Sequence, residues 1–461
     1  MTTTLGERDE VLDDDNRLRR GFVAAVVARL DASDAEGARA LVDPLHEADI
    51  ADLFELLPAD YRQDLAKALG DKLDADVIAE MNDWVRESLL DERTPTDIAE
   101  VVSELDTDDA VSIIEELDED DRREVMRALD PDDRAAIEEA LSYPEESAGR
   151  LMQRDLVAVP EHWTIARIVD FIGSEPDLPT DFWEVFVVDP SHHPVGTIRL
   201  SWLLTQSRDA VVGAVMQRDQ TLIPVDEDQE EVALQFQKYA LISAAVVDGD
   251  GRLVGVITVD DIVHIIQQEA GEDALLLSGA GDGDINEPIA ATIRTRMWWL
   301  FINLWTAILA AGVVAIFQDA IAKLVTLAVL MGIVNGMGGN AATQTMAVTV
   351  RALATNQLTS SNTARMIRRE LLIALANGVG LGALMAVGCQ LVYHDWPLTG
   401  VLFAAMVINS VNAGLSGILI PVGLEKAGVD PAITSTVFVT TMTDVIGFFS
   451  FLGLAALFHL H

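Results

Sequence analysis

The hydrophobic residues of this chain follow three patterns in succession, and each pattern predicts a different kind of structure. From about residue 297 onward, long apolar runs alternate with short polar stretches. An α-helix needs about 20 predominantly apolar residues to cross the ~30 Å hydrocarbon core of a bilayer. The pattern therefore predicts five membrane-spanning helices, at roughly 297–317, 324–349, 371–393, 398–424 and 434–459.

Between residues 98 and 141, leucine recurs every twelve residues, and an aspartate follows each of the first three leucines. The apolar positions within each unit are three or four residues apart, as in an amphipathic helix, and aspartate is a favoured N-cap. Units this short must stack to bury their apolar faces, so we expect a small helical-repeat domain. An ordinary irregular helical bundle is the alternative. The repeated residues are Leu105, Leu117, Leu129 and Leu141, with Asp106, Asp118 and Asp130.

A second duplication follows. The segment MQRD occurs at residues 152–155 and again at 216–219. After each copy the sequence predicts a strand, an amphipathic helix, two apolar strands and a further helix. This order, given twice, resembles a tandem pair of CBS domains, which dock into a disc whose cleft often holds an adenine nucleotide.

The second copy keeps a motif of a glycine, a hydroxyl and a carboxylate, in which the hydroxyl and the carboxylate can hydrogen-bond to a ribose. The first copy keeps Gly196 and Ser201, but Leu204 stands where the acid would be. We therefore expect a nucleotide such as ATP to be held, if at all, through the second copy. Its candidate residues are Gly255, Thr258 and Asp261.

Charge is divided unevenly between these regions. The chain of 461 residues carries 31 Lys and Arg against 75 Asp and Glu, a net charge of −44. From residue 291 onward there are eight basic and six acidic residues, which leaves 23 basic and 69 acidic residues before that point. The chain therefore has an acidic soluble front and a membrane tail. Acids spread over the whole front are typical of a halophilic protein, because concentrated salt screens their repulsion.

Several function classes are disfavoured. Cys389 is the only cysteine, so no disulfide forms within the chain, and the acidic N-terminus lacks the apolar core of a signal peptide. We find no Walker motif, no HExxH and no catalytic-triad spacing, so we expect no enzyme activity, and we expect no nucleic-acid partner. The run DGDG at residues 248–251 lacks the remaining acids of a calcium loop, and a turn explains it.

Polar residues interrupt three of the predicted spans. The second span reads GMGGNAATQ at residues 336–344, where carbonyl, amide and hydroxyl oxygens can bind a cation or its waters. The fourth span carries Asn409 and Asn412, and the last carries Asp444, a lone carboxylate in an apolar run. An ionisable group at membrane depth is costly and indicates function by default. Helix packing is the competing interpretation of the glycines and the asparagine in the second span taken by itself. Polar residues on three spans together favour an ion pathway.

Taken together, these features resemble the MgtE family of magnesium channels over essentially the whole chain. The shared features are the domain order, GxGGNxxxQ in the second span and TDVxG in the last. The resemblance implies a homodimer with its pore on the two-fold axis and Asp444 as the pore acid. Mg²⁺ sheds water reluctantly, so a polar ring with two carboxylates can hold it through its waters. The residues implied to line the path are Gly336, Gly339, Asn340 and Thr343.

The resemblance also implies a sensor for cytoplasmic Mg²⁺, in which ions bound between acidic residues draw the soluble domains together and close the pore. Ser112 and Ala240 stand where further acids are expected, so the sensor is expected to hold fewer ions. For each acid the competing interpretation is a solvated residue of a halophilic surface. The matching positions are Asp108, Glu230, Asp261, Glu269, Glu272, Asp273 and Asp430.

The predicted fold is therefore multidomain, with an all-α N domain, an α/β CBS pair, a connecting helix and an α-helical membrane domain of five spans. Arginines between the second and third runs place that loop, and with it the acidic front, in the cytoplasm of a plasma-membrane protein. The predicted boundaries are 1–147 for the N domain, 148–205 and 206–265 for the CBS domains, 266–293 for the connecting helix and 294–461 for the membrane domain.

The predicted function is passive Mg²⁺ influx, gated by cytoplasmic Mg²⁺. One alternative is an ion-coupled transporter of divalent cations such as Mg²⁺, Co²⁺ or Mn²⁺. A single intramembrane acid argues against it, since a coupled carrier usually needs a second site. The other alternative is a membrane-anchored nucleotide sensor that acts through its CBS domains. Five spans with polar residues in their middle argue against it, because an anchor needs fewer spans and no polar residues.

Overall fold

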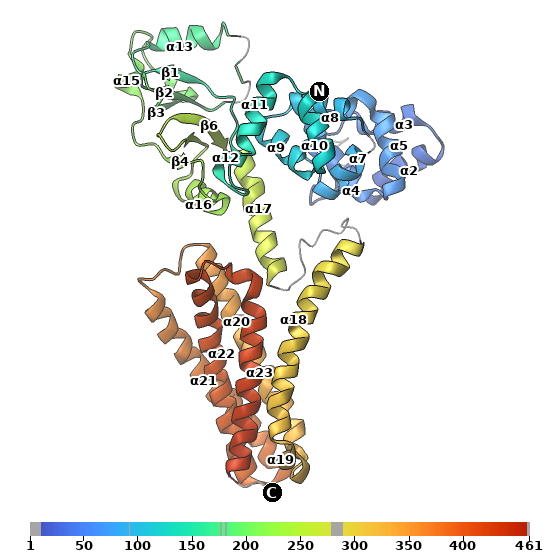
Figure 1. The fold of residues 1–461 in the computed structure, drawn as a ribbon, viewed down its shortest axis with the longest axis vertical. Coiled ribbons are helices and arrows are strands. Elements are labelled where there is room, and N and C mark those ends of the chain that lie inside the picture. The colour runs from blue at the N-terminus through green and yellow to red at the C-terminus, as the bar shows by residue number, and fades with distance from the viewer. Residues whose placement is uncertain (1–10, 92, 176–177, 180–181, 278–288, 459–461) are drawn as a thin grey trace. The chain divides into compact units, whose positions relative to one another are not determined.

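The computed structural model divides the chain into two compact units, Met1–Gln267 and Gln268–His461 (Figure 1). The residues that it describes are 11–91, 93–175, 178–179, 182–277 and 289–458. Within these ranges the side chains of residues 71, 273, 291 and 433–435 are left undescribed.

The first unit begins with short helices that stack on one shared apolar core. Four of them start twelve residues apart, which confirms the repeat read from the sequence. Asp106, Asp118 and Asp130 are the N-caps of α9, α10 and α11, so each repeat begins at the acid that follows its leucine. The helices are α2 (Arg20–Asp31), α3 (Ala35–Val42), α4 (Glu47–Leu56), α5 (Ala59–Leu69), α6 (Ala75–Ala79), α7 (Asp83–Leu90), α8 (Pro95–Glu104), α9 (Thr107–Glu116), α10 (Glu119–Ala128) and α11 (Pro131–Ala140).

One buried cation ties these helices together. Arg86 of α7 is 4% exposed, and its guanidinium forms an ion pair with Glu116 at the end of α9. It also donates to Asp83 Oδ1 at 3.0 Å, to Ala79 O at 3.1 Å and to Ser112 Oγ at 3.2 Å. Every partner of this arginine is an oxygen, so its charge is compensated inside the core.

Two three-stranded sheets follow in the same unit. In each, the first strand pairs in parallel with the second, and the second pairs antiparallel with the third. The order of strand, helix, strand, strand and helix is thus confirmed in both copies. The strands are β1 (Ala158–Pro160), β2 (Glu184–Val188), β3 (Pro194–Arg199), β4 (Leu222–Pro224), β5 (Ser243–Val247) and β6 (Leu253–Thr258). The helices are α12 (Ala148–Leu151), α13 (Ile165–Ile172), α14 (Leu200–Leu203), α15 (Val212–Val215), α16 (Gln229–Tyr239) and α17 (Val259–Leu276).

Each MQRD segment forms backbone hydrogen bonds with the last strand of the other copy. Gln153 pairs with Val256 of β6, with N–O distances of 2.8 and 2.9 Å, and Gln217 pairs in the same way with Thr197 of β3. Each segment therefore lies against the sheet of the other copy. A Cβ at Gly255 would lie 2.9 Å from the carbonyl oxygen of Gln153, so this close approach requires glycine.

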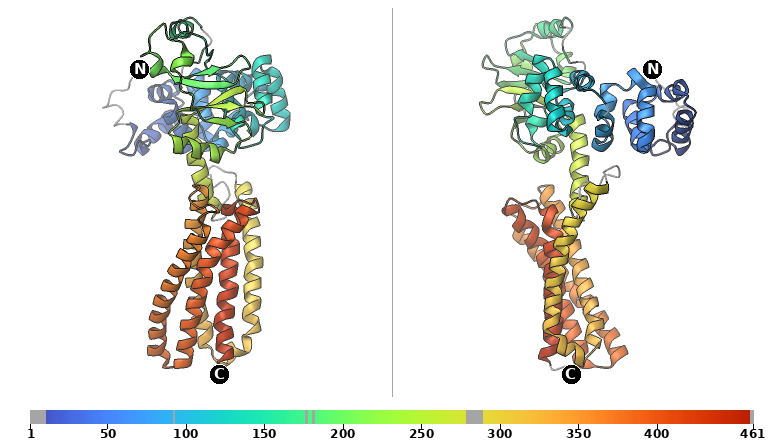
Figure 2. Two further views of the ribbon diagram at one scale, coloured as in Figure 1. Left: turned by 90° about the vertical axis from the view of Figure 1, so that its left-hand side faces the viewer. Right: turned by 45° about the vertical axis from the view of Figure 1, so that its right-hand side comes forward.

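The second unit is a helical bundle. Helices α20 to α23 run side by side in the two views of Figure 2, and α22 packs against α20, α21 and α23. Large side chains such as Phe451, Leu327 and Leu402 are fully buried between the helices. The helices are α18 (Ile289–Ile316), α19 (Gln318–Lys323), α20 (Thr326–Ala354), α21 (Thr363–Tyr393), α22 (Trp396–Lys426) and α23 (Pro431–Leu457).

Within the described residues, four helices are long and apolar enough to cross a membrane, so a count of five spans is not confirmed. The four segments are Thr292–Ile316, Thr363–Tyr393, Trp396–Lys426 and Thr436–Leu457. The helix that falls short is α20, which has 29 residues but carries the polar motif of residues 336–344. Its length is ample at 1.5 Å per residue, so its polarity is what sets it apart.

The connecting segment is described only in part. Helix α17 begins at Val259 and ends at Leu276, so the unit boundary falls inside it, and α18 begins at Ile289. Residues 278–288 of the predicted connecting helix lie outside the described residues. The domain boundaries given above therefore stay predictions.

Replacing Arg86 tests the role of its buried charge. We expect Arg86→Leu to destabilise α7 and α9 by about 3–5 kcal/mol, because Glu116 is left buried without its cation. Hydrogen–deuterium exchange of the full-length protein should show faster exchange in both helices. The control is Arg123→Leu, since Arg123 makes only exposed pairs with Glu119 and Asp120 among the described residues. Equal effects of the two substitutions would contradict the role of Arg86.

Candidate functional site

The carboxylate singled out in the membrane unit is held at the middle of its helix by an amide. Asp444 lies thirteen residues from each end of α23 (Pro431–Leu457) and is partly buried. Asn335 of α20 donates from Nδ2 to Asp444 Oδ1 at 2.6 Å. Two helices that carry polar motifs thus meet at this pair.

A second buried amide lies beside the pair. Asn409 of α22 is 1% exposed and donates from Nδ2 to the carbonyl oxygen of Val334 at 3.0 Å. A Cβ at Gly447 would lie 2.5 Å from Asn335 Oδ1 and 2.8 Å from Asn409 Nδ2, so glycine lets α23 approach both amides. Within the part of the chain described, Oδ1 of Asn335 and Oδ1 of Asn409 are buried without a hydrogen-bond partner. Unpaired acceptors beside a carboxylate suit a hydrated cation.

The residues predicted to line the path form a different surface. Gly336, Asn340 and Thr343 are three or four residues apart on α20 and are exposed, while Gly339 beside them is partly buried. A Cβ at Gly336 or Gly339 would meet no atom within 4 Å. Thr343 donates to the carbonyl oxygen of Gly339 at 3.0 Å, within the helix. The structure therefore places these four residues on an open polar face, and among the residues described none of them is hydrogen-bonded to Asp444.

Two of the predicted sensor acids lie close together in the first unit. Burial raises the pKa of Asp108 on α9 well above its ordinary value, and the charge of Asp261 at the start of α17 raises it further. Burial also raises the pKa of Asp261 to about 6, against a hydrogen bond from Thr258 Oγ1 of 2.8 Å that lowers it. Oδ1 of Asp108 is buried without a hydrogen-bond partner among the described residues. The two carboxylates repel each other when both are ionised.

A third acid, which the sequence did not single out, joins this pair. Burial raises the pKa of Asp109 to about 6, with the charge of Asp106 adding and that of Arg86 opposing. The candidate nucleotide residues meet at the same place, because Asp261 Oδ2 accepts from Thr258 and, at 3.3 Å, from Gln153 Nε2. A single-chain metal cage is nevertheless not formed: over the described residues, no three of His, Cys, Asp and Glu are placed to hold an ion.

The other predicted sensor acids are not brought to this pair by any contact described. The backbone amide of Glu230 bonds to Asp228 at the start of α16. Asp430 is the N-cap of α23, where its carboxylate accepts from Ala432 N at 2.7 Å. The remaining three are on the part of α17 that belongs to the second unit, and the side chain of Asp273 lies outside the described residues. These three are Glu269, Glu272 and Asp273.

Two polar residues of the membrane unit were missed from the sequence. Asn335 stands one position before the glycine-rich motif, and that position was its only signal. Glu370 on α21 is 9% exposed, and Thr345 of α20 donates to its Oε2 at 3.4 Å. In sequence it follows two arginines directly, so it read as part of a charged loop.

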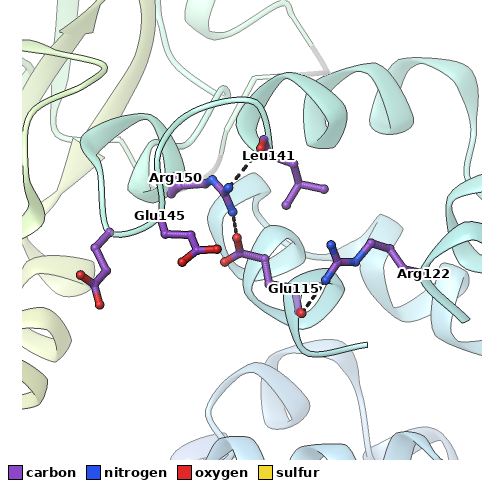
Figure 3. A pocket seen from close by; sticks show the side chains of 6 residues that line it. Glu115, Arg122, Leu141, Glu145 and Arg150 are labelled. Carbon is purple, nitrogen blue, oxygen red and sulfur yellow. Dashed lines mark hydrogen bonds and ion pairs between the residues drawn. The ribbon is translucent and has the colours of Figure 1, made fainter. Parts of the chain in front are cut away.

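A cavity of about 370 Å³ in the first unit is lined mainly by acids and arginines (Figure 3). Arg150 forms an ion pair with Glu115 and donates to the carbonyl oxygens of Tyr143, at 2.9 Å, and Leu141, at 3.1 Å. Arg122 donates to the carbonyl oxygen of Glu115 at 2.7 Å. Arg150 connects α12 to α9, and Arg122 connects α10 to α9, so we assign the cavity a structural role.

Comparison with known proteins gives a consistent result along the chain. Residues 331–454 match the family of divalent cation transporters described as MgtE, residues 45–146 match the MgtE intracellular N domain, and residues 212–268 match the CBS domain. The chain is 30% identical over 318 residues to the magnesium transporter MgtE of Enterococcus faecalis, covering 69% of this chain and 70% of that protein. It is 29% identical over 430 residues to the magnesium transporter MgtE of Bacillus subtilis, covering 91% of this chain and 93% of that protein.

A solved cytosolic domain is also similar. It is the cytosolic domain of the Mg²⁺ channel MgtE in complex with ATP, with 26% sequence identity and a TM-score of 0.49. The match covers 53% of this chain and 99% of that structure.

The pKa shifts predict a pH dependence for the contact between α9 and α17. The folded-state pKa values of Asp108 and Asp261 lie above the ordinary 3.8, so this contact is stabilised as pH falls through about 6 and loses that stability as pH rises. In Mg²⁺-free buffer, Asp108→Asn should therefore raise the unfolding temperature of the soluble domains by a few degrees at about pH 7.5. The difference from wild type should be smaller near pH 5 and should approach zero only below the ordinary pKa of 3.8, where the unfolded chain is protonated as well.

Calorimetry of the full-length protein measures this difference. The control is Glu100→Gln, which neutralises an exposed acid on α8 and should give no pH-dependent difference. A benefit of Asp108→Asn that is equally large at both pH values would contradict the repulsion between the two carboxylates.

Proposed function

This chain belongs to the MgtE family of magnesium transporters, and we propose that it is a passive Mg²⁺ channel that cytoplasmic Mg²⁺ closes. It is a multidomain membrane protein with an N-terminal MgtE domain, CBS domains and a divalent cation as substrate. The observation that carries the channel proposal is the hydrogen bond from Asn335 to Asp444 at the middle of α23. A carboxylate kept at that depth by a fixed amide is a preformed site for a cation.

The chemistry of this site suits a hydrated ion. Mg²⁺ prefers octahedral oxygen ligands and usually keeps several of its waters. The site offers one carboxylate and the buried oxygens of Asn335 and Asn409, which are acceptors for water hydrogens. Too few ligands are present to strip Mg²⁺ of its waters, so the ion would pass largely hydrated, held by Asp444 through water.

The proposed assembly is a homodimer in the plasma membrane. In it, α20 is the fifth span, and its polar face of Gly336, Gly339, Asn340 and Thr343 lines the path beside a second copy. Such a face cannot be satisfied by lipid, because hydrocarbon offers no hydrogen bonds. The arginines between α20 and α21 support a cytoplasmic N-terminus by the positive-inside rule.

Gating is proposed to use the repulsion between acids. Without Mg²⁺, Asp108 and Asp261 repel each other across the contact of α9 with α17, which favours separation. A bound cation binds the closed arrangement better than the separated one, which is the condition for a ligand to shift a population. Glu230, Glu269, Glu272, Asp273 and Asp430 are proposed as further sensor acids on the same principle.

Nucleotide binding is proposed at the second CBS copy. Thr258 and Asp261 already bond to each other beside Gly255, so a ribose bound there would compete for their hydrogen bond. ATP and a sensor cation would then compete for the carboxylate of Asp261, which lies near Asp108. We therefore propose that ATP, where it binds, acts on the sensor and not on the membrane site.

The second candidate function is an ion-coupled transporter. Glu370 favours it, because a second buried acid in the membrane unit removes the argument that Asp444 stands alone. Mg²⁺ flux into proteoliposomes with no proton or sodium gradient distinguishes the two candidates. A channel conducts under the Mg²⁺ gradient alone, whereas a coupled carrier does not.

Asp444→Asn tests the membrane site. We expect it to abolish Mg²⁺ flux or to reduce it more than tenfold without unfolding the protein, because a buried charge is costly and its loss removes the countercharge of the ion. Flux into proteoliposomes should be compared with Asp319→Asn, which neutralises an exposed acid of the same unit. Wild-type flux in correctly inserted Asp444→Asn protein would contradict the assignment of Asp444 to the pore.

Neutralising the three acids of α17 tests the sensor. We expect the triple variant of Glu269, Glu272 and Asp273 to close less readily as internal Mg²⁺ rises, because the differential binding that favours closure is lost. The matched control neutralises Glu119, Asp120 and Asp121, three exposed acids at the start of α10. An unchanged inhibition curve in the first variant would mean that its acids belong to the solvated surface.

A further inference from the structure

A second cavity, with polar side chains set among apolar ones, lies in the membrane unit apart from Asp444. It has a volume of about 180 Å³ and lies between α20, α21 and α22. Its polar lining consists of one carboxylate, two amides and two hydroxyls, from Glu370, Gln344, Asn377, Thr345 and Ser410. Every one of these side chains offers oxygen, the ligand atom that hard cations prefer.

The carboxylate in this cavity is buried without a cationic side chain. Glu370 is 9% exposed, and among the residues described it accepts one hydrogen bond from another side chain, the 3.4 Å contact from Thr345. The neighbouring Arg368 and Arg369 are exposed, and no ion pair between an arginine and Glu370 occurs among the residues described. An ionised carboxylate removed from water costs several kcal/mol unless another charge or several hydrogen bonds compensate it.

The cavity is fixed by close helix packing. A Cβ at Gly378 would lie 2.9 Å from Ser410 Cβ, and one at Gly414 would lie 2.8 Å from Ala374 Cβ. These glycines let α21 and α22 pack closely about one and two turns beyond Glu370 along α21, so the polar groups are held by the backbone. Gln344 and Asn377 are exposed at the rim, where lipid could not satisfy their amides.

We propose that this cavity is a second cation site, in which Glu370 holds a hydrated divalent cation with Thr345, Gln344, Asn377 and Ser410. The volume accommodates an ion with several waters, and the single charge suits binding through water instead of direct coordination. Thr345 follows Asn335 by ten residues on α20, which places the site about 15 Å along the helix from Asp444. The proposal goes beyond the pore and does not require that Asp444 conducts.

Anomalous diffraction from crystals of the full-length protein soaked in Mn²⁺ tests the site, because Mn²⁺ shares the preference of Mg²⁺ for octahedral oxygen. We expect an anomalous peak in the cavity of the wild-type protein and its loss in Glu370→Gln. The matched control is Glu425→Gln, which removes an exposed carboxylate of the same unit and should leave the peak in place.

A second variant keeps the test decisive if Glu370→Gln does not fold. Thr345→Val keeps the shape and removes the hydroxyl, and it should raise the Mn²⁺ concentration for half occupancy about tenfold. The peak should persist in Asp444→Asn, which separates this site from the pore. No peak in the wild-type cavity, or a peak that Glu370→Gln leaves unchanged, would overturn the proposal.

Discussion

A carboxylate that leaves water needs compensation, and this constraint decides the chemistry of both units. In the membrane unit, Asp444 is compensated by one amide hydrogen bond, and Glu370 by one long hydrogen bond from a hydroxyl. In the soluble unit, Asp108 lies near Asp261, and each carboxylate makes the other more costly to ionise. All four are incompletely compensated among the residues described, which is why we propose a cation from solution as the partner of each.

Small residues make these positions possible. Gly447 lets α23 approach the amides of Asn335 and Asn409, and Gly255 lets the chain at Gln153 cross beside the strand that leads to Asp261. A side chain at either position would separate the elements that carry the polar groups. The glycines therefore set the geometry, while the amides and acids supply the chemistry. By contrast, Arg86 shows what a fully compensated charge looks like, since each of its partners is an oxygen at bonding distance.

The sequence predicted those features that depend on local periodicity. The twelve-residue spacing of leucine and aspartate gave the start of each repeat, and the paired MQRD segments gave both sheets. It did not predict the partner of Asp444 or the burial of Glu370, because both depend on which face of one helix meets another. Asn335 differs from an exposed asparagine only in its contact with α23, and Glu370 differs from a loop acid only in the close packing of α21 on α22. The apolar run at 324–349 predicted a span at α20, but the polar residues within that helix keep it out of the four helices that are apolar enough to cross a membrane, so the fifth span stays a prediction.

The most direct test of the proposed channel is the current through the full-length protein in a planar bilayer while cytoplasmic Mg²⁺ is stepped. We expect a Mg²⁺ current that needs no other ion gradient and that falls as cytoplasmic Mg²⁺ rises. A current that is independent of cytoplasmic Mg²⁺ would contradict the sensor. Transport without any Mg²⁺ current would contradict the channel itself.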